Sequence, residues 1–363
     1  MYDVLITILI FGITIFAIVH LARFGRLPRG KRLERVKKSP NYRDGKFHNL
    51  TPTPVMAEKV SHFGLLKESL LAKNKRPVGK IPAIKTDLKS LDPKKDVMVW
   101  FGHSSCFLQV DGKKILVDPS LSGKASPFSF LIKAFDGSDL YKPENMPEID
   151  YLFITHDHWD HLDFDTIMSL KPKIKKIICP LGVGSYFEYW GFIKSRIIER
   201  DWNEEIKLED GFFAYPVPAR HFSGRAFSRN KTLWAAYVIV TPSFKIFISG
   251  DGGYDSHFEK IGAIFDGFDL AILENGQYDD AWKYIHMKPE EVIQAAKDLQ
   301  AKRILPFHSS KFTISNHAWN EPLKRITELN KVAKLNLITP MIGEVVDLKN
   351  DKQVFGEWWK EVK

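Results

Sequence analysis

The chain has 363 residues and is 44% hydrophobic, which is ample for a sizeable core and fits one large α/β unit with an appendage. Its two cysteines, Cys106 and Cys179, are too few for a disulfide framework and lie among apolar neighbours, so we expect packed free thiols. The formal net charge is +9, but it comes mainly from one N-terminal block, which argues against a nucleic-acid footprint on the body. The basic residues of this block are Arg23, Arg26, Arg29, Lys31, Arg32, Arg35, Lys37 and Lys38.

The first predicted element is a membrane-spanning helix over residues 4–22. His20 is its only ionisable side chain. A helix of this length measures about 28 Å, which is enough to cross a hydrocarbon core. The alternative, a cleaved signal peptide, would need a positively charged start and a small-residue cleavage site. Because Asp3 precedes the run and Arg23 follows it, we expect a membrane anchor over residues 1–24.

A basic juxtamembrane arm and linker is expected over residues 25–95. Positive charge beside a span marks the cytoplasmic side and attracts anionic headgroups, so we expect a single-pass protein whose body faces the cytoplasm. A basic stop signal without lipid preference is the alternative. Prolines and lysines are frequent over residues 39–95. We therefore expect one short amphipathic helix over residues 61–73, within an extended arm that lies on the body or links it to the membrane.

From residue 96 onward, apolar strand-like runs alternate with helix-like segments, and most of these strands run up to a polar residue. Strands are predicted at 97–101, 114–117, 151–154, 177–179, 212–220, 232–240, 245–248, 269–273 and 304–307. Asp111–Gly112 and Pro242–Ser243 predict hairpin turns between strands. Helices are expected at 164–170, 289–299 and 321–332. Because hairpins and helical connections both occur, we expect a mixed sheet.

The densest polar motif is the loop over residues 155–163, Thr-His-Asp-His-Trp-Asp-His-Leu-Asp, which follows the predicted strand at 151–154. Histidine and aspartate supply the nitrogen and oxygen ligands that borderline divalent metals prefer. On an extended segment, His156 and His158 point the same way. Asp160 and His161 are then free to turn toward a second position, so one loop can supply two neighbouring metal ions. A polar surface loop is the alternative interpretation.

Three further polar residues follow later predicted strands in the same manner. They are His221, Asp251 and His308. A single such residue is more often packed or exposed than a ligand. Seven candidates in one recurring context, His156, His158, Asp160, His161, His221, Asp251 and His308, instead indicate a dinuclear metal site.

These residues resemble the signature of the metallo-β-lactamase superfamily, in which His-x-His-x-Asp-His is followed by a later His, Asp and His. The resemblance covers residues 96–363 and implies an α/β (α+β) hydrolase domain built as a four-layer αββα sandwich, preceded here by the N-terminal transmembrane helix. The segments 102–105, 116–119, 218–222 and 286–291 are similar to the family of phospholipases D that hydrolyse N-acyl-phosphatidylethanolamine. The predicted span and basic arm depart from the mammalian members of that family.

The resemblance implies a role for each of these residues. His156, His158 and His221 would hold one zinc ion, and Asp160, His161 and His308 the other, with Asp251 between them; iron or manganese could replace zinc. Asp118 and His286 match family positions associated with activity. Asp118 would orient or buffer the hydroxide held by the metals, and His286 would contact the phosphate or assist the leaving group.

The substrate implied by the resemblance is N-acyl-phosphatidylethanolamine or a similar membrane phospholipid. Its negatively charged phosphate would be favoured beside the basic block and a dicationic site. Phe128 and Phe130 could line an acyl-chain entrance, although a core strand or helix explains that run as well. His103 is a further candidate for substrate binding, and it shapes the first loop more plausibly than it binds metal.

Other functions remain open from the sequence. The first is a metal-dependent lactonase or phosphodiesterase that acts on a soluble metabolite with the same metal site. A di-iron redox protein has a tolerant ligand set, but no flavin-binding domain is evident. A membrane scaffold with a structural metal is a third class, although structural zinc sites usually have four closed ligands. The oligomeric state is open, with a dimer among the alternatives.

Overall fold

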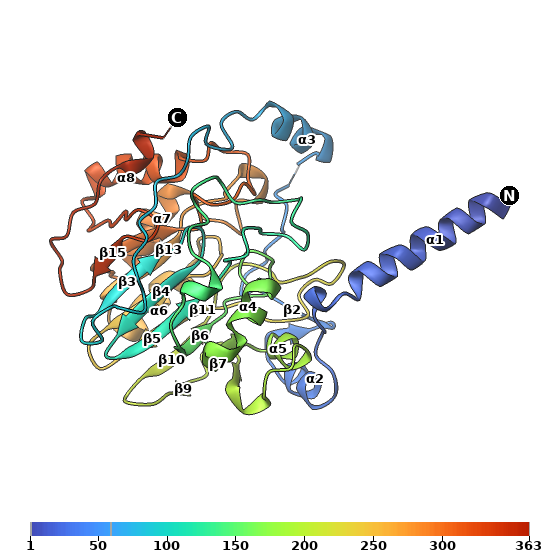
Figure 1. Ribbon diagram of the computed structural model, residues 1–363, viewed down its shortest axis with the longest axis horizontal. Coiled ribbons are helices and arrows are strands. Elements are labelled where there is room, and N and C mark those ends of the chain that lie inside the picture. The colour runs from blue at the N-terminus through green and yellow to red at the C-terminus, as the bar shows by residue number, and fades with distance from the viewer. Residues whose placement is uncertain (1, 59, 363) are drawn as a thin grey trace.

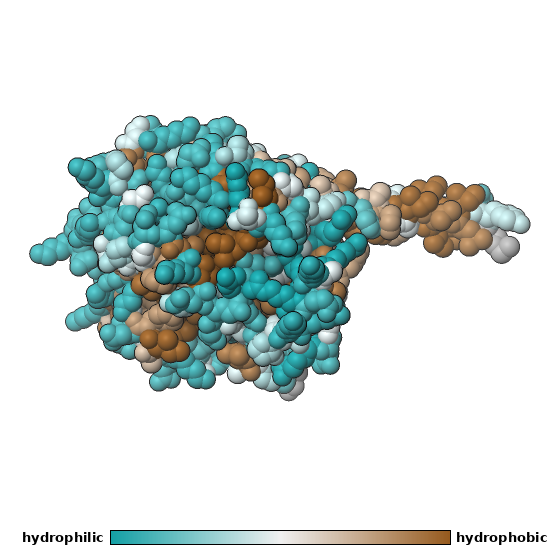
Figure 2. Space-filling model, turned by 90° about the horizontal axis from the view of Figure 1, so that it is seen from below, coloured by the Kyte–Doolittle hydropathy of each residue, from teal (hydrophilic) through white to brown (hydrophobic). Residues whose placement is uncertain are grey.

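The computed structural model describes residues 2–58 and 60–362, and its N-terminal helix stands apart from a body that holds every other element (Figure 1). This helix, α1 (Tyr2–Val19), has a mean hydropathy of 2.4 and no buried residue. A short turn, η1 (Ala22–Phe24), joins it to the body. Figure 2 shows α1 as an apolar rod beside a mainly hydrophilic surface. The predicted apolar helix is therefore confirmed, although it ends at Val19 instead of Ala22.

The first of two large sheets has seven strands and contains the early part of the body. In spatial order its strands are β15 (Val345–Asp347), β3 (Val97–Trp100), β4 (Cys106–Val110), β5 (Lys113–Val117), β6 (Ile149–Phe153), β7 (Ile174–Pro180) and β8 (Ile197–Arg200). Pairing is antiparallel from β15 to β5 and parallel from β5 to β8. The sequence did not reveal β4 as a separate strand. The predicted turn at Asp111–Gly112 joins β4 to β5, because both residues adopt the left-handed backbone of a tight hairpin.

The second sheet has six strands. In spatial order they are β14 (Ile304–Phe307), β13 (Leu270–Glu274), β12 (Lys245–Ile248), β11 (Ala236–Val240), β10 (Phe213–Val217) and β9 (Ile206–Lys207). The hairpin predicted at Pro242–Ser243 is present and pairs β11 with β12. β12, β13 and β14 run parallel to one another. Both sheets are mixed, as the combination of hairpins and crossovers predicted.

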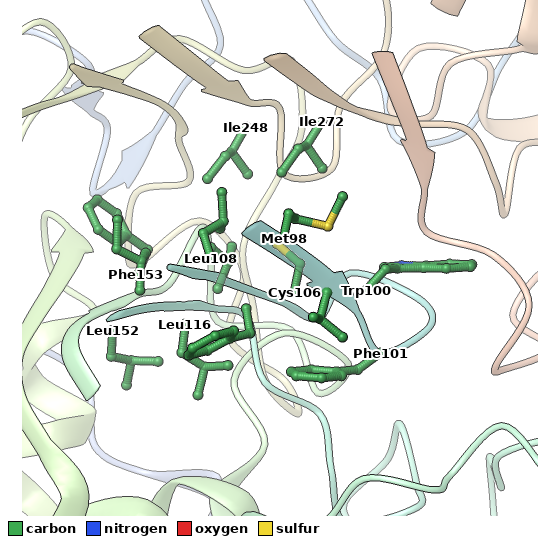
Figure 3. Packing of buried hydrophobic residues seen from close by; sticks show 14 of the residues in the cluster. Met98, Trp100, Phe101, Cys106, Leu108, Leu116, Leu152, Phe153, Ile248 and Ile272 are labelled. Carbon is green, nitrogen blue, oxygen red and sulfur yellow. The ribbon is translucent and has the colours of Figure 1, made fainter. Parts of the chain in front are cut away.

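The two sheets face each other across the core, because alternate side chains of a strand point to opposite faces of its sheet. On β12, Ile246 and Ile248 belong to the cluster shared with the first sheet, whereas Phe247 between them belongs to the cluster on the outer face. Ile248 lies close to Leu108 of β4 in Figure 3. The two cysteines are buried free thiols, as expected.

Helices cover the outer faces of the two sheets. Those packed into the cluster of the first sheet are α4 (Phe164–Leu170) and α5 (Gly184–Tyr189). Those packed on the second sheet are α6 (His257–Phe265), α7 (Pro289–Asp298) and α8 (Glu321–Ala333). The remaining short turns are η2 (Pro143–Asn145), η3 (Lys171–Lys173), η4 (Lys194–Arg196), η5 (Asp280–Trp282) and η6 (Trp358–Lys360). The result is the expected sandwich of helices around two sheets.

The basic arm is docked on the body. Its elements are α2 (Gly30–Lys37), β1 (Tyr42–Arg43), β2 (Lys46–Phe47) and α3 (His62–Leu71). Only α3 was predicted. Val36 and Phe47 are fully buried in the cluster of the second sheet. Arg32 pairs with Glu199 at 2.9 Å, so at least this member of the basic block is directed to the body and not to lipid headgroups.

Because Phe47 is fully buried, its loss should destabilise the protein as loss of a core residue would. We expect Phe47→Ala to lower the free energy of unfolding by about 3–5 kcal/mol. Denaturant unfolding of the detergent-solubilised chain measures this. Val78, 91% exposed in the same arm, is the matched control, and Val78→Ala should change stability by less than about 0.5 kcal/mol. Equal stability of the two variants would show that the arm is not docked.

Candidate metal centre

The seven predicted ligand residues converge because the strands that precede them deliver their loops to one edge of the sandwich. The loop over residues 156–161 follows β6, whereas His221, Asp251 and His308 follow β10, β12 and β14. Six of the seven are buried, and His158 is half-buried. Strand order thus brings together side chains that are far apart in the sequence.

The first group of ligand atoms surrounds His158. Nδ1 of His158 lies 2.9 Å from Nε2 of His156 and 3.3 Å from Nε2 of His221. Both of these Nε2 atoms lie 3.9 Å from Oδ2 of Asp251. Three nitrogens and one oxygen therefore enclose one point, as the predicted first ligand set requires.

The second group adjoins the first through Asp251. Nε2 of His161 and Nε2 of His308 lie 3.6 and 3.5 Å from Oδ2 of Asp160. Oδ1 of Asp251 lies 3.2 Å from His161 Nε2, and its Oδ2 lies 3.1 Å from His308 Nε2. Asp251 is thus the carboxylate common to both groups, which is the position predicted for it.

The donor set fits divalent metal ions. Zinc–nitrogen bonds of 2.0–2.1 Å in a tetrahedron place neighbouring ligand atoms about 3.3 Å apart, in the middle of the distances above. In addition, Asp251 Oδ1 and His308 Nε2 are buried, and no described residue forms a hydrogen bond with either. Buried polar atoms without partners are costly, so their presence here supports a site built for an ion.

The loop of Asp251 can enter this crowded edge because of its glycines. Gly250 has φ +59°, and a Cβ at this position would lie 2.9 Å from Cβ of Thr155. A Cβ on Gly253 would overlap the carbonyl oxygen of Tyr284. Glycine is therefore required on both sides of the carboxylate.

Three other residues of the site adopt the left-handed backbone that non-glycine residues seldom use. They are His103 (φ 52°), Asp118 (φ 39°) and His308 (φ 66°). A hydrogen bond joins the loops of His308 and His103, because the backbone amide of His308 donates to the carbonyl of His103 at 3.0 Å. Such strained conformations concentrate at functional sites, where surrounding contacts maintain them.

Asp118 lies behind His161 and not in the open site. Its Oδ2 lies 2.8 Å from Nδ1 of His161 and accepts from the Thr155 hydroxyl at 2.5 Å. Its Oδ1 accepts from the Thr155 amide at 2.8 Å. With both oxygens engaged and no exposed surface, Asp118 is placed to fix the ring of His161. Direct contact with a hydroxide in the open site does not fit this position, so the expected role in orienting or buffering a hydroxide would have to act through His161.

His103 is buried as well, so the expected role in substrate binding does not fit. Its Nε2 lies 2.8 Å from Oδ2 of Asp160. Burial, together with the neighbouring His308, lowers the pKa of His103 to about 3, so the ring is neutral. A neutral Nε2–H donates to Asp160 and fixes that carboxylate. This agrees with the interpretation that His103 shapes its loop.

His286 lines the pocket above the metal groups. Its Nδ1 donates to Oε1 of Glu274, and its ring stacks 5.5 Å from that of His308 at 13°. The same Oε1 lies 3.2 Å from Nδ1 of His308, while Oε2 accepts from the Gly252 amide at 2.6 Å. Sequence reasoning missed Glu274, although its place at the end of a fully apolar strand was a usable signal.

His221 is held by a backbone carbonyl, which contacts its ring, and by the arm, which contacts its backbone. Nδ1 of His221 lies 3.0 Å from the carbonyl oxygen of Ile285. The amide of Asn49 donates to the carbonyl of His221 at 2.7 Å, and its Oδ1 accepts from the His221 backbone N–H at 3.1 Å. Asn49 belongs to the segment expected to be an extended linker, and nothing in its local sequence indicates this role.

Burial and neighbouring charges divide the histidines into two kinds. Burial lowers the pKa of His156 and His221 well below the usual range, which leaves neutral rings able to bind metal. Burial also acts on His161, but the carboxylates of Asp251, Asp160 and Asp118 outweigh it and raise the pKa to about 10. In this position a metal cation would take the place of that proton.

Phe128 and Phe130 do not line the metal pocket. They border a separate hollow with residues 21–23, at the end of the N-terminal helix. Phe130 is 71% exposed and the run forms neither a core strand nor a helix. The two rings therefore lie away from the metal pocket, and their expected role at an acyl-chain entrance stays a prediction.

A sandwich of two mixed sheets with such a ligand cluster on one edge is the architecture of metal-dependent hydrolases with the metallo-β-lactamase fold. The family model described as "Beta-lactamase superfamily domain" matches residues 113–309, more than half of the chain. The chain belongs to this superfamily.

Its relatives include proteins with and without a described activity. An uncharacterized protein of Mycobacterium tuberculosis is 35% identical over 340 residues, covering 89% of this chain and 88% of the relative. The N-acyl-phosphatidylethanolamine-hydrolyzing phospholipase D 1 of Caenorhabditis elegans is 28% identical over 269 residues, covering 68% and 74%. Among solved structures, a metallo hydrolase of Ignicoccus hospitalis matches with a TM-score of 0.51 at 22% identity, covering 70% and 98%.

Asp251 provides the sharpest test of the two-metal geometry. We expect Asp251→Asn to fold but to lose at least one metal, because the amide removes the charge that both groups share. Hydrolytic turnover should fall by about a hundredfold or more. Elemental analysis beside a thermal melt measures both effects. Asp201→Asn is the matched control, because Asp201 is also buried and, among the described residues, only its Oδ1 accepts hydrogen bonds, which an asparagine oxygen can accept as well. Two metals and normal turnover in Asp251→Asn would contradict the assignment.

Glu274 should act through the histidines that it contacts. Glu274→Gln keeps size and shape but removes the negative charge near His286 and His308, and we expect metal affinity to fall by about 10–100-fold. Competition with a chelator measures this affinity. Glu291→Gln is the control, since Glu291 closes the capping box of α7 and glutamine fills that role. Equal affinities in the two variants would remove Glu274 from the site.

Proposed function

We propose that this protein is a membrane-anchored, zinc-dependent phosphodiesterase that hydrolyses N-acyl-phosphatidylethanolamine or a similar phospholipid in the manner of a phospholipase D. The observation that carries the proposal is an apolar-walled pocket that opens directly above the metal-binding residues. Membership of the hydrolase superfamily supports the chemistry, and the pocket walls support a substrate with an apolar part.

The pocket has a volume of about 260 Å³ and combines two kinds of surface. Its polar floor consists of His158, Asp160, Asp251, Gln277, His286 and His308. Its apolar walls consist of Val55, Met56, Phe222, Trp282, Ile285 and Ile314. A polar reacting centre surrounded by apolar walls suits a phosphodiester that carries hydrocarbon on one side.

The chain's own residues can bind the phosphodiester and handle the proton. Metals bound by the two groups would lower the pKa of water and offset charge on a phosphoryl group. His286 donates Nδ1–H to Glu274, so Nε2 is left for the substrate. In phospholipase D-type cleavage the bond from phosphorus to the ethanolamine oxygen breaks, and that oxygen needs a proton. Nε2 of His286 is placed to hold this proton and pass it on.

Two further observations support a lipid substrate. Helix α1 is long and apolar enough to cross a membrane, which would place the pocket near a bilayer. Relatives from Caenorhabditis elegans and Saccharomyces cerevisiae, at 28% and 31% identity, are named as phospholipases D that hydrolyse N-acyl-phosphatidylethanolamine. We extend this substrate class to the present chain.

The size of the pocket favours a second candidate function. A volume of about 260 Å³ is below the range of roughly 300–1,000 Å³ typical of ligand pockets. It would accept a headgroup and phosphate, or else a complete small metabolite. A lactonase or phosphodiesterase for a soluble metabolite would use the same metal site.

Mass spectrometry of lipids after incubation with the purified protein separates these functions. We expect N-acyl-phosphatidylethanolamine in mixed vesicles to yield phosphatidic acid and N-acylethanolamine. The Asp251→Asn variant should form both products at least about a hundredfold more slowly, because it lacks the shared carboxylate. Release of diacylglycerol would contradict the bond assignment. Turnover of small phosphodiesters or lactones without any lipid product would favour the soluble-metabolite function.

A further inference from the structure

The lower end of α1 enters the body between two loops that each present exposed aromatic side chains. We call residues 19–24 the foot of α1 and residues 126–131 and 225–228 the foot loops. Residues 21–23 border one hollow with the first loop, and residues 19–20 border another with the second. In Figure 1 the second loop, drawn in yellow, reaches toward the foot. Both loops therefore lie where a membrane surface would meet the protein.

The first foot loop is fixed to the foot while its tip faces outward. The guanidinium of Arg23 donates to the carbonyl of Pro127, and the ring of Phe24 lies 6.5 Å from that of Phe128. The ring of Phe128 stacks in turn on Phe130 at 5.7 Å. Phe130 is nevertheless 71% exposed and Leu131 53% exposed. Phe130 and Leu131 are therefore exposed on a loop whose position is fixed by contacts with the foot.

The second foot loop is held by a buried arginine. Arg225 donates to the backbone carbonyl of Arg23 at 2.6 Å and to that of Asp157 at 2.7 Å. Its guanidinium lies 4.1 Å from the ring centre of Trp159, inside the metal-binding loop. Two residues further on, Phe227 is 82% exposed. A rigid connection therefore runs from the metal loop to an exposed phenyl ring beside α1.

The charge around the foot matches an anionic bilayer. Arg26, Arg29 and Lys31 are exposed, and in the part of the chain that the structure describes no carboxylate lies within ion-pair distance of them. Aromatic rings flanked by basic side chains are the composition that favours the interfacial region of a membrane. The apolar surface of α1 continues directly into this patch, so a bilayer that receives α1 also reaches the foot loops.

We propose that Phe130, Leu131 and Phe227 insert into the interfacial region of the bilayer and form a second membrane contact around the foot of α1. The proposal rests on the proposed membrane location but not on the phospholipid substrate. Two inserted loops beside one membrane-spanning helix would fix both the tilt and the rotation of the body. Phe24 packs edge-on against Trp159 at 5.0 Å, so the metal loop is held beside the membrane surface.

Site-directed fluorescence on the full-length chain tests this contact. Cys106 and Cys179 are buried, and burial raises the pKa of both thiols, so an introduced exposed cysteine can be labelled selectively. We would label Phe130→Cys and Phe227→Cys with an environment-sensitive dye and reconstitute each in nanodiscs that contain anionic phospholipid. Lipids with a nitroxide near the headgroup then quench dyes in the interface.

Two further variants complete the design. Ile10→Cys in α1 reports on the span, using lipids with a nitroxide deep in their acyl chains. Val354→Cys, 88% exposed near the C-terminus, is the matched control.

We expect dyes at positions 130 and 227 to shift to the blue and to lose most of their fluorescence to the shallow nitroxide, while the dye at 354 does neither. Quenching at position 10 without quenching at 130 and 227 would overturn the second contact and leave the anchor intact. Quenching at 130 and 227 without quenching at position 10 would support the contact and contradict the span. Dyes shielded from aqueous iodide but unquenched by lipid would indicate a covering protein, and this also overturns the proposal.

Discussion

The carboxylate of Asp251 is the interaction on which the rest of this structure depends. It is 4% exposed and faces imidazoles from both ligand groups at 3.1–3.9 Å. A buried charge is stable only when opposite charge compensates it, so this carboxylate requires cations, whether protons on His161 and His308 or metal ions. Strands from both sheets must end at the same edge to supply those partners. The sandwich is thus the scaffold for one shared negative charge.

Around this centre, buried carboxylates contact the histidine rings on the side away from the ligand atoms. Asp118 fixes His161, and Glu274 contacts His308 and His286. Each outer carboxylate is fully buried and lies at or beside a strand end, so its position is as rigid as the sheet. Ligands that are held in this way lose little freedom when an ion binds, which favours affinity.

Much of the fold and site could be predicted because the relevant signals are local. Apolar runs that end in His or Asp made it possible to predict where strands of both sheets end. The same pattern predicted that Asp251 and His308 belong to one site. What could not be predicted depends on contacts between distant segments. Asn49 supports His221 across 172 positions, and no local pattern marks either partner for the other. Phe130 illustrates a different difficulty, because a local pattern is present but ambiguous. An apolar run looks alike whether it faces a core, a pocket or lipid.

The contact between Asn49 and His221 also has a consequence for biosynthesis. The arm leaves the ribosome long before His221, yet the side chain of Asn49 in the arm makes two hydrogen bonds with the backbone of this ligand residue. Loop closure over such a separation is slow compared with local structure formation. Asn49 must therefore wait for this contact until His221 has been translated. Maturation of the metal centre is consequently a late event, and a nascent chain holds its apolar helix long before it holds a complete ligand set.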